Sequence, residues 1–173
     1  MNATLNIGQT IGDFRVEEFV KASNENGGET YFVSGRDGKK ALMKLYAVEA
    51  KAHAIECGSA AVLQNLGFLP MVANGSIEHN GSSYQYIVRD YVEAKRLSDL
   101  IDEGKLYSWE QATPIILQVL VALKHLHSQE PAIIHNDITA RNILIKEEDE
   151  NVRVYIIGMG HLSYRCNGRA SFC

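Results

Sequence analysis

Cysteine is scarce in this chain, and it has neither an excess of basic residues nor a long hydrophobic run. The three cysteines, Cys57, Cys166 and Cys173, are odd in number and share no metal-type spacing, so a reducing, cytoplasmic setting is expected. The net charge of −4 provides no basic field for nucleic acid or an anionic membrane. The longest apolar stretch, residues 114–123, contains Gln118 and is shorter than a membrane span. We therefore expect neither nucleic acid nor a membrane as a partner.

The N-terminal residues lack a basic start followed by an apolar run, so a secretory signal peptide is not expected. No internal repeat or low-complexity segment is present. With 46% hydrophobic and 22% charged residues, the chain of 173 residues has the composition of a soluble globular protein and enough length for a sizeable core.

The first half of the chain is predicted to form strands around one helix. Turn signals at residues 36–38 and at Asn80-Gly81 lie between alternating apolar stretches. Residues 49–66 have helical spacing and are followed by Gly67, which is typical of a helix end. The apolar face of this helix comprises Ile55, Val62, Leu63 and Leu66. The expected strands are residues 13–21, 30–34, 40–46, 71–78 and 84–90.

Helices are predicted to dominate after Tyr91. A short helix is expected at residues 97–103, and a longer one ends near Ser128. Its start is open between two solutions: Ser108 and Gln111 fit a capping box, whereas Pro114 favours a later start with Thr113 as the cap. Two further strands are expected at residues 142–146 and 152–157. This order predicts an α+β protein with two lobes, residues 1–91 and 92–173.

The segment IIHNDITARNILI, residues 133–145, is the most informative part of the sequence. It places His135, Asp137 and Asn142 at fixed offsets between two apolar runs. This layout resembles the catalytic loop of protein kinases, His-Arg-Asp with an Asn five residues after the Asp. Together with the element order, it identifies the chain as similar to the protein kinase superfamily, bacterial or eukaryotic-like Ser/Thr/Tyr kinases, from about Asp13 onward. The resemblance implies an antiparallel sheet with one helix, then an incomplete, mainly helical lobe.

The same resemblance assigns roles to the loop and to one lysine. Asp137 would be the catalytic base, and Asn142 would hold Mg²⁺ while ATP supplies the phosphate. Lys44 ends the apolar run Ala41-Leu42-Met43, and a lysine there is costly to point inward unless it meets anions. In the family that lysine binds the ATP phosphates and a helix Glu. An exposed lysine at a strand end is the competing interpretation of Lys44.

The helix partner of Lys44 is open at the sequence level. The register set by the apolar residues puts Ser59 where a Glu is expected, and Glu56 lies one turn earlier on the same face. Either Glu56 substitutes as the partner or the ion pair with Lys44 is absent. A surface Glu is the competing interpretation.

Two further segments resemble nucleotide-binding parts of the family. Gly28 matches the third glycine of the glycine-rich loop, while Ser23 and Glu25 stand at the first two glycine positions, so an ordinary hairpin turn competes with a phosphate loop. Residues 87–92 resemble the hinge, in which backbone groups around Asp90 and Val92 would bind adenine. Arg89 would then stand at the back of the nucleotide pocket.

Three substitutions separate this sequence from an active kinase. Asn136 replaces the Arg of the loop, so regulation by a phosphate on the following segment is not expected. Thr139 replaces a Lys that would contact the transferred phosphate. Gly158 stands where the Asp of Asp-Phe-Gly should hold metal, and glycine has no oxygen-bearing side chain. Thirteen residues follow Gly160, so the sequence reads as truncated after the Asp-Phe-Gly position.

These features predict a kinase-like domain whose phosphotransfer is degenerate or inactive and whose binding of ATP and Mg²⁺ is weak or lost. A nucleotide, and a protein that covers the incomplete second lobe, are the partners it implies. The alternatives are a small-molecule kinase of the aminoglycoside or choline type, a non-catalytic binding module and a gene fragment.

Overall fold

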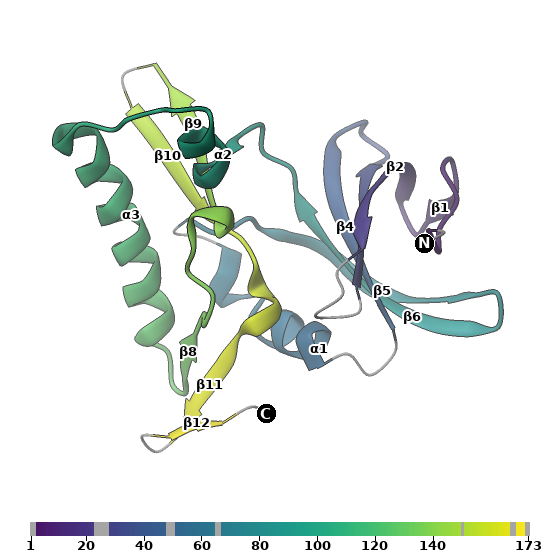
Figure 1. Cartoon of the computed structure of the whole chain (residues 1–173). Coiled ribbons are helices and arrows are strands. Elements are labelled where there is room, and N and C mark those ends of the chain that lie inside the picture. The colour runs from purple at the N-terminus through teal and green to yellow at the C-terminus, as the bar shows by residue number, and fades with distance from the viewer. Residues whose placement is uncertain are drawn as a thin grey trace. The chain divides into compact units, whose positions relative to one another are not determined.

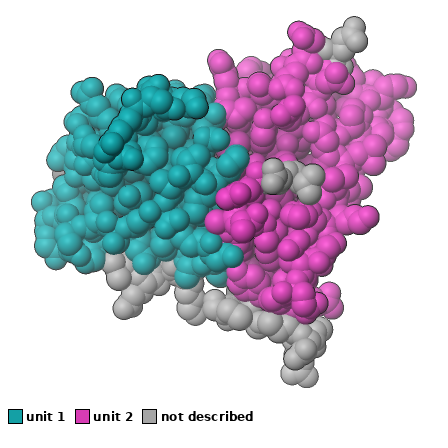
Figure 2. Space-filling model, turned by 180° about the vertical axis from the view of Figure 1, so that it is seen from behind, with its two compact units in different colours: residues 1–58, 70–91 teal, residues 59–69, 92–173 magenta. Residues whose placement is uncertain are grey.

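The structure is a computed structural model that describes residues 3–22, 28–47, 51–64, 67–149, 151–166 and 169–171. It divides into two compact units, which Figure 2 distinguishes by colour. Unit 1 contains residues 1–58 and 70–91, and unit 2 contains residues 59–69 and 92–173.

Unit 1 is an antiparallel sheet of six strands in the order β1-β2-β3-β4-β6-β5 with one helix, α1 (Figure 1). The five strands predicted for this region are confirmed, with ends that differ by two residues or fewer. The elements are β1 (Thr10–Ile11), β2 (Phe14–Ala22), β3 (Gly28–Ser34), β4 (Lys40–Ala47), α1 (Lys51–Gly58), β5 (Met71–His79) and β6 (Ser82–Asp90).

One face of this sheet carries the apolar core of unit 1. Because side chains alternate along a strand, Ala41, Met43 and Leu45 of β4 point to this face and pack with Val88 of β6. Burying one such side chain contributes about 1.5–3 kcal/mol. Lys44 points to the opposite face. The sheet thus separates an apolar side from a side with polar side chains.

The predicted helix at residues 49–66 is too long. Helix α1 ends at Gly58, and a separate 3₁₀ turn, η1 (Val62–Gln64), follows it. Glycine is a poor helix residue, and the Ser59 carbonyl accepts the N–H groups of Val62 and Leu63 in a turn. The apolar residues of the prediction are therefore split between two elements: Ile55 lies in unit 1 and Leu63 in unit 2.

Unit 2 combines two helices with two small antiparallel sheets, β10-β9-β7 and β12-β11-β8 (Figure 1). Its elements after η1 are β7 (Lys95–Arg96), α2 (Leu97–Asp102), α3 (Trp109–His127), β8 (Ala132–Ile134), η2 (Ala140–Asn142), β9 (Ile143–Glu148), β10 (Asn151–Ile156), η3 (Met159–His161), β11 (Ser163–Cys166) and β12 (Arg169–Ser171). A cluster of buried side chains joins α2, α3 and the β9-β10 hairpin: Leu100, Ile115, Ile143, Ile145 and Val154.

Helix α3 settles the choice between the two predicted starts. Ser108 is the N-cap and forms a complete capping box with Gln111, so the alternative start at Thr113 is wrong. Pro114 lies inside the helix. One face packs Ile115, Ala122 and Leu126 inward, whereas Ile116, Leu117, Leu120 and Val121 are each about half exposed.

The predicted α+β class is confirmed, and unit 2 holds more strands than expected for a mainly helical lobe. Residues 59–69, which the sequence analysis placed in the first lobe, group with unit 2. The reason is local: Ile156 donates to the Gly67 carbonyl, and Phe68 forms a parallel bridge with Ile156. Among the described residues, no helix has the length and apolarity needed to cross a bilayer.

Candidate functional site

The segment after β8 is organised around a buried histidine in unit 2. His135 is almost completely buried, and its Nε2 donates to the Ile157 carbonyl at 3.0 Å. Its Nδ1 accepts the Asp137 N–H at 3.2 Å. These two bonds require a neutral ring protonated at Nε2. Burial lowers the pKa of His135, which favours the same neutral form.

Asp137 and Asn142 are brought together by the 3₁₀ turn η2. Both hydrogens of the Asn142 amide are used here, because Nδ2 donates to Asp137 Oδ2 at 2.7 Å and to the Asp137 carbonyl at 2.9 Å. The Thr139 hydroxyl, at the N-cap of η2, is buried and has no hydrogen-bond partner within the described part of the chain. The arrangement places the Asp137 carboxylate beside the Asn142 amide.

Gly158 packs directly against the Asn142 amide. It has a left-handed backbone (φ 84°), and a Cβ atom added there would lie 2.6 Å from Asn142 Cγ and Oδ1 and 2.7 Å from Nδ2. The Ile157 N–H also donates to the Asn142 carbonyl at 2.9 Å. Position 158 therefore has neither the side chain nor the room for a carboxylate while Asn142 keeps this orientation.

These residues do not fit a magnesium ion held in the way the resemblance implies. Mg²⁺ needs a near-octahedral set of oxygen ligands, usually with carboxylates among them. Asn142 contributes one amide oxygen, and Gly158 contributes no side-chain oxygen. Within the described residues, no group of three or more His, Cys, Asp or Glu is placed to hold a metal ion.

Asn136 links the loop to the segment after Gly158. Its backbone is left-handed (φ 64°), a conformation that Asn tolerates better than most residues. Its amide nitrogen donates to the His161 carbonyl at 2.7 Å and lies 2.8 Å from the hydroxyl of buried Ser163. Strand β11 continues this link by pairing with β8. The link is made by neutral groups and needs no phosphate.

In unit 1, Lys44 lies beside Glu56 in a cluster of polar side chains. Lys44 Nζ is 3.5 Å from Glu56 Oε1, and Arg89 Nη2 is 3.2 Å from Oε2. The Tyr46 hydroxyl donates to Oε1 at 2.6 Å. Glu56 therefore stands as the helix partner of Lys44, whereas Ser59, at the register position, is bonded to Tyr164 in unit 2.

Charges keep Glu56 ionised despite its burial. Burial alone would raise the pKa of Glu56, but Lys44 and Arg89 outweigh it, so the pKa is lowered. Burial and the adjacent Glu56 carboxylate together raise the pKa of Tyr46. Two cations therefore converge on one buried carboxylate.

Gly28 lies next to Lys44 at the start of β3. A Cβ atom at Gly28 would lie 3.2 Å from the Leu45 carbonyl, which is a tight contact, and 3.5 Å from Lys44 Cε, which is an ordinary van der Waals contact. The rest of the predicted glycine-rich loop, residues 23–27 with Ser23 and Glu25, lies outside the described residues. The structure thus places one member of that loop near Lys44.

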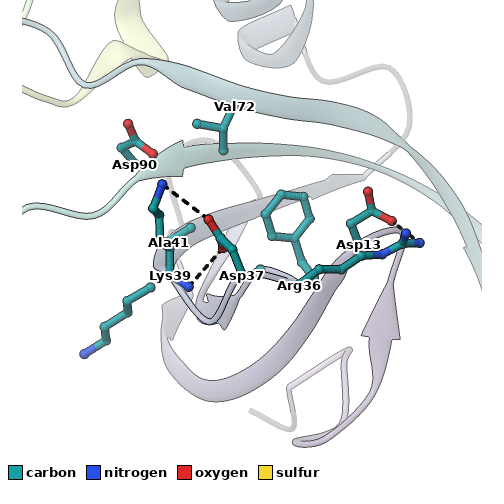
Figure 3. A pocket seen from close by; sticks show the side chains of 10 residues that line it. Asp13, Arg36, Asp37, Lys39, Ala41, Val72 and Asp90 are labelled. Atoms are coloured by element: carbon teal, nitrogen blue, oxygen red, sulfur yellow. Dashed lines mark hydrogen bonds and ion pairs between the residues drawn. The ribbon is translucent and has the colours of Figure 1, made fainter.

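The side chain of Asp90, one of the two predicted hinge residues, points away from Lys44. Asp90 is exposed and pairs with Ala41, on the sheet face opposite Lys44, and Val92 is half-buried in unit 2. Asp90 instead borders a pocket of about 330 Å³ in unit 1, which includes the ion pairs Asp13–Arg36 and Asp37–Lys39 (Figure 3). This pocket is separate from the Lys44 cluster.

The contacts of two members of the Lys44 cluster, Arg89 and Tyr46, were not predicted from the sequence. Arg89 was noted as an unusual residue behind the nucleotide pocket, but its contact with Glu56 was not foreseen. Tyr46 was not considered at all. The available signal was strand alternation, because Tyr46 follows Lys44 by two residues and so points to the same face.

Comparison with known proteins identifies a family that this sequence matches. The protein kinase domain family matches residues 36–172. A probable receptor-like protein kinase of Arabidopsis thaliana is 30% identical over 170 residues, which covers 87% of this chain and 27% of that protein. A serine/threonine-protein kinase-like protein of the same plant is 38% identical over 88 residues, 51% of this chain and 21% of the relative.

A bacterial protein is also similar to this chain. A probable serine/threonine-protein kinase of Corynebacterium efficiens is 33% identical over 90 residues, 52% of this chain and 13% of that protein. The chain therefore matches between 13% and 27% of the length of these relatives.

Proposed function

We propose that this chain, which belongs to the protein kinase domain family, serves as a non-catalytic kinase-like module. Members of this family are phosphotransferases that generally use ATP and Mg²⁺. The observation that carries the proposal is the contact between Gly158 and Asn142 in unit 2. The metal-binding carboxylate is missing, and the neighbouring amide fills the space its first carbon would need.

The reaction in this family depends on positioning and on charge stabilisation by metal ions. A loose phosphoryl transition state spreads negative charge over its oxygens, and in this family it is neutralised by metal ions held by the Asp of Asp-Phe-Gly and the Asn of the loop. Here Thr139 replaces the charged residue of the loop, and its hydroxyl supplies no charge. The loss of both the metal-binding carboxylate and the charged loop residue supports weak or absent phosphoryl transfer more strongly than either loss alone.

The cluster in unit 1 supports a module that keeps its shape without a nucleotide. Lys44, the predicted phosphate ligand, lies within 3.5 Å of Glu56, and Tyr46 and Arg89 bond the same carboxylate. In the protein kinase family this lysine binds the helix Glu and the ATP phosphates together, so the pair is compatible with a nucleotide. We propose that ATP binding is weak or lost because Gly158 in unit 2 lacks the metal-binding carboxylate, and that the domain acts by binding another molecule.

A transfer assay with ATP labelled at the γ-phosphate tests the proposal. The wild-type chain is incubated with Mg²⁺ or Mn²⁺ and a generic protein substrate, beside Asp137→Ala and Gly158→Asp. We expect no label on the chain or the substrate in any of the three. Label that appears with the wild type and vanishes in Asp137→Ala would contradict the proposal. Transfer by Gly158→Asp alone would show that the missing carboxylate was the sole defect.

A further inference from the structure

We propose that Arg89, more than Lys44, is the positioning residue that holds Glu56, and with it helix α1, against the sheet of unit 1. Arg89 lies on β6 and Lys44 on β4, and both reach the Glu56 carboxylate from the same face. This inference concerns the fold of unit 1 and is independent of whether the domain transfers phosphate.

The two carboxylate oxygens of Glu56 accept hydrogen bonds from different donors. Within the described part of the chain, Oε1 accepts from Tyr46 at 2.6 Å and from Lys44 at 3.5 Å, whereas Oε2 accepts from Arg89 at 3.2 Å. Loss of Lys44 leaves Oε1 with the shorter of its two bonds. Loss of Arg89 removes the bond to Oε2, and an unpaired buried acceptor is more costly than a weakened bond.

The side chains of Arg89 and Lys44 also differ in how far they are buried. The exposed fraction of the side chain is 4% for Glu56, 14% for Arg89 and 27% for Lys44. The attraction between charges weakens with hydration, so the drier Arg89 pair is less screened than the Lys44 pair. Both cations act on the Glu56 charge, and Arg89 adds a shorter, less exposed hydrogen bond to the oxygen that Lys44 does not contact.

Helix α1 depends on its contacts with the sheet for stability. It contains eight residues, fewer than an isolated helix needs for stability in water. Among the side chains of α1 that the structure describes, Ile55 is the buried apolar one, and His53 packs edge-on against the Tyr46 ring and hydrogen-bonds the Tyr86 backbone. Glu56 adds the charged contact between α1 and the sheet, and its cation partners act on that contact.

Matched variants separate the two cations. Arg89→Met and Lys44→Met each replace a long cation with a long apolar side chain, and thermal unfolding and hydrogen exchange of the α1 amides are measured for both. We expect Arg89→Met to lower the Tm by roughly 10 °C and to speed exchange in α1. Lys44→Met should lower it by about 3 °C or less. An equal or larger loss in Lys44→Met would overturn the proposal.

A charge-specific measurement distinguishes an electrostatic role of Arg89 from a role that depends only on the size of its side chain. If Arg89 compensates Glu56, Arg89→Lys should recover part of the loss, and Arg89→Met/Glu56→Gln should be more stable than Arg89→Met, because a neutral amide needs no cation. The deficit of Arg89→Met should also shrink as the pH falls toward 4, since the carboxyl becomes protonated. Lys44, Tyr46, His53 and Cys57 surround the same carboxyl and are unchanged in this comparison. No recovery in the double variant and a pH-independent deficit would refute the inference, even if Arg89→Met alone failed to fold.

Discussion

The backbone of Gly158 and the side chain of Asn142 are in direct contact, so close that a Cβ atom at residue 158 would lie 2.6 Å from Asn142 Cγ. Real Cβ atoms essentially never approach a neighbour so closely. The amide cannot turn away freely, because it also donates two bonds to Asp137. The glycine is therefore a structural requirement of this loop.

The first prediction is that Gly158→Ala destabilises unit 2 by more than its backbone conformation explains. Gly104 is the matched control, because it has a similar left-handed backbone (φ 82°) and no atom within 4 Å of its Cβ position. Gly104→Ala should cost about 1–2 kcal/mol for the left-handed backbone. Gly158→Ala should cost at least about 1–3 kcal/mol more, because the new methyl group overpacks the loop. Urea unfolding of both variants measures the difference.

The same prediction includes a test of the contact itself. In an Asn142→Ala background the amide is gone, so the extra cost of Gly158→Ala should fall to the value of the Gly104 control. If the extra cost persists without the amide, the contact with Asn142 is not its cause.

The second prediction concerns the pH dependence that His135 gives to stability. Burial lowers its pKa in the folded protein, so below about pH 6.5 the unfolded chain binds more protons than the folded chain. The free energy of unfolding should therefore be lost as the pH falls from 6.5 through the lower, folded pKa. Asp137 and His161 also act on this ring. Denaturant midpoints between pH 5 and 7.5 should show a smaller slope in His135→Gln than in the wild type; identical slopes would argue against a buried neutral ring.

The third prediction is that Asn136→Asp loosens the segment after Gly158. The variant keeps the shape of the side chain but loses the N–H donor to the His161 carbonyl, and it places a carboxylate beside that carbonyl. The expected cost is about 1–3 kcal/mol, with faster hydrogen exchange in β11. Asn80→Asp is the control, because Asn80 also has a left-handed backbone (φ 51°), in the β5-β6 turn. We expect it to change stability by about 0.5 kcal/mol or less. Equal effects at both positions would show that the link to His161 is unimportant.

Local patterns in the sequence were sufficient for most strands. Alternation and the Asn80-Gly81 turn located β5 and β6, whereas Ser108 with Gln111 was one of two candidate starts for α3 and is the one that the structure has. Such signals depend on residues a few positions apart, which interact whatever the rest of the chain does. The end of α1 was missed because the apolar period continues through Gly58 although the helix does not.

The candidate site was predictable in its members but only partly in its contacts. The sequence analysis singled out Asp137, Asn142 and Gly158, yet the packing of Gly158 on the Asn142 amide depends on a left-handed backbone that no spacing reveals. The bond between Glu56 and Arg89 joins residues 33 positions apart and exists only once α1 docks on β6. The roles of Lys44, Gly28, Asp90 and Val92 in nucleotide binding remain predictions.

Thermal unfolding with ATP, in the presence of Mg²⁺ or of a chelator, tests the central claim most directly. The claim is that the loop formed by Asp137, Asn142 and Gly158 does not support a metal-bound nucleotide. We predict Tm values that agree within about 1 °C with and without the metal, because a ligand that does not bind cannot shift the folding equilibrium. A rise of about 5 °C or more that requires Mg²⁺ and disappears in Asn142→Ala would contradict the claim.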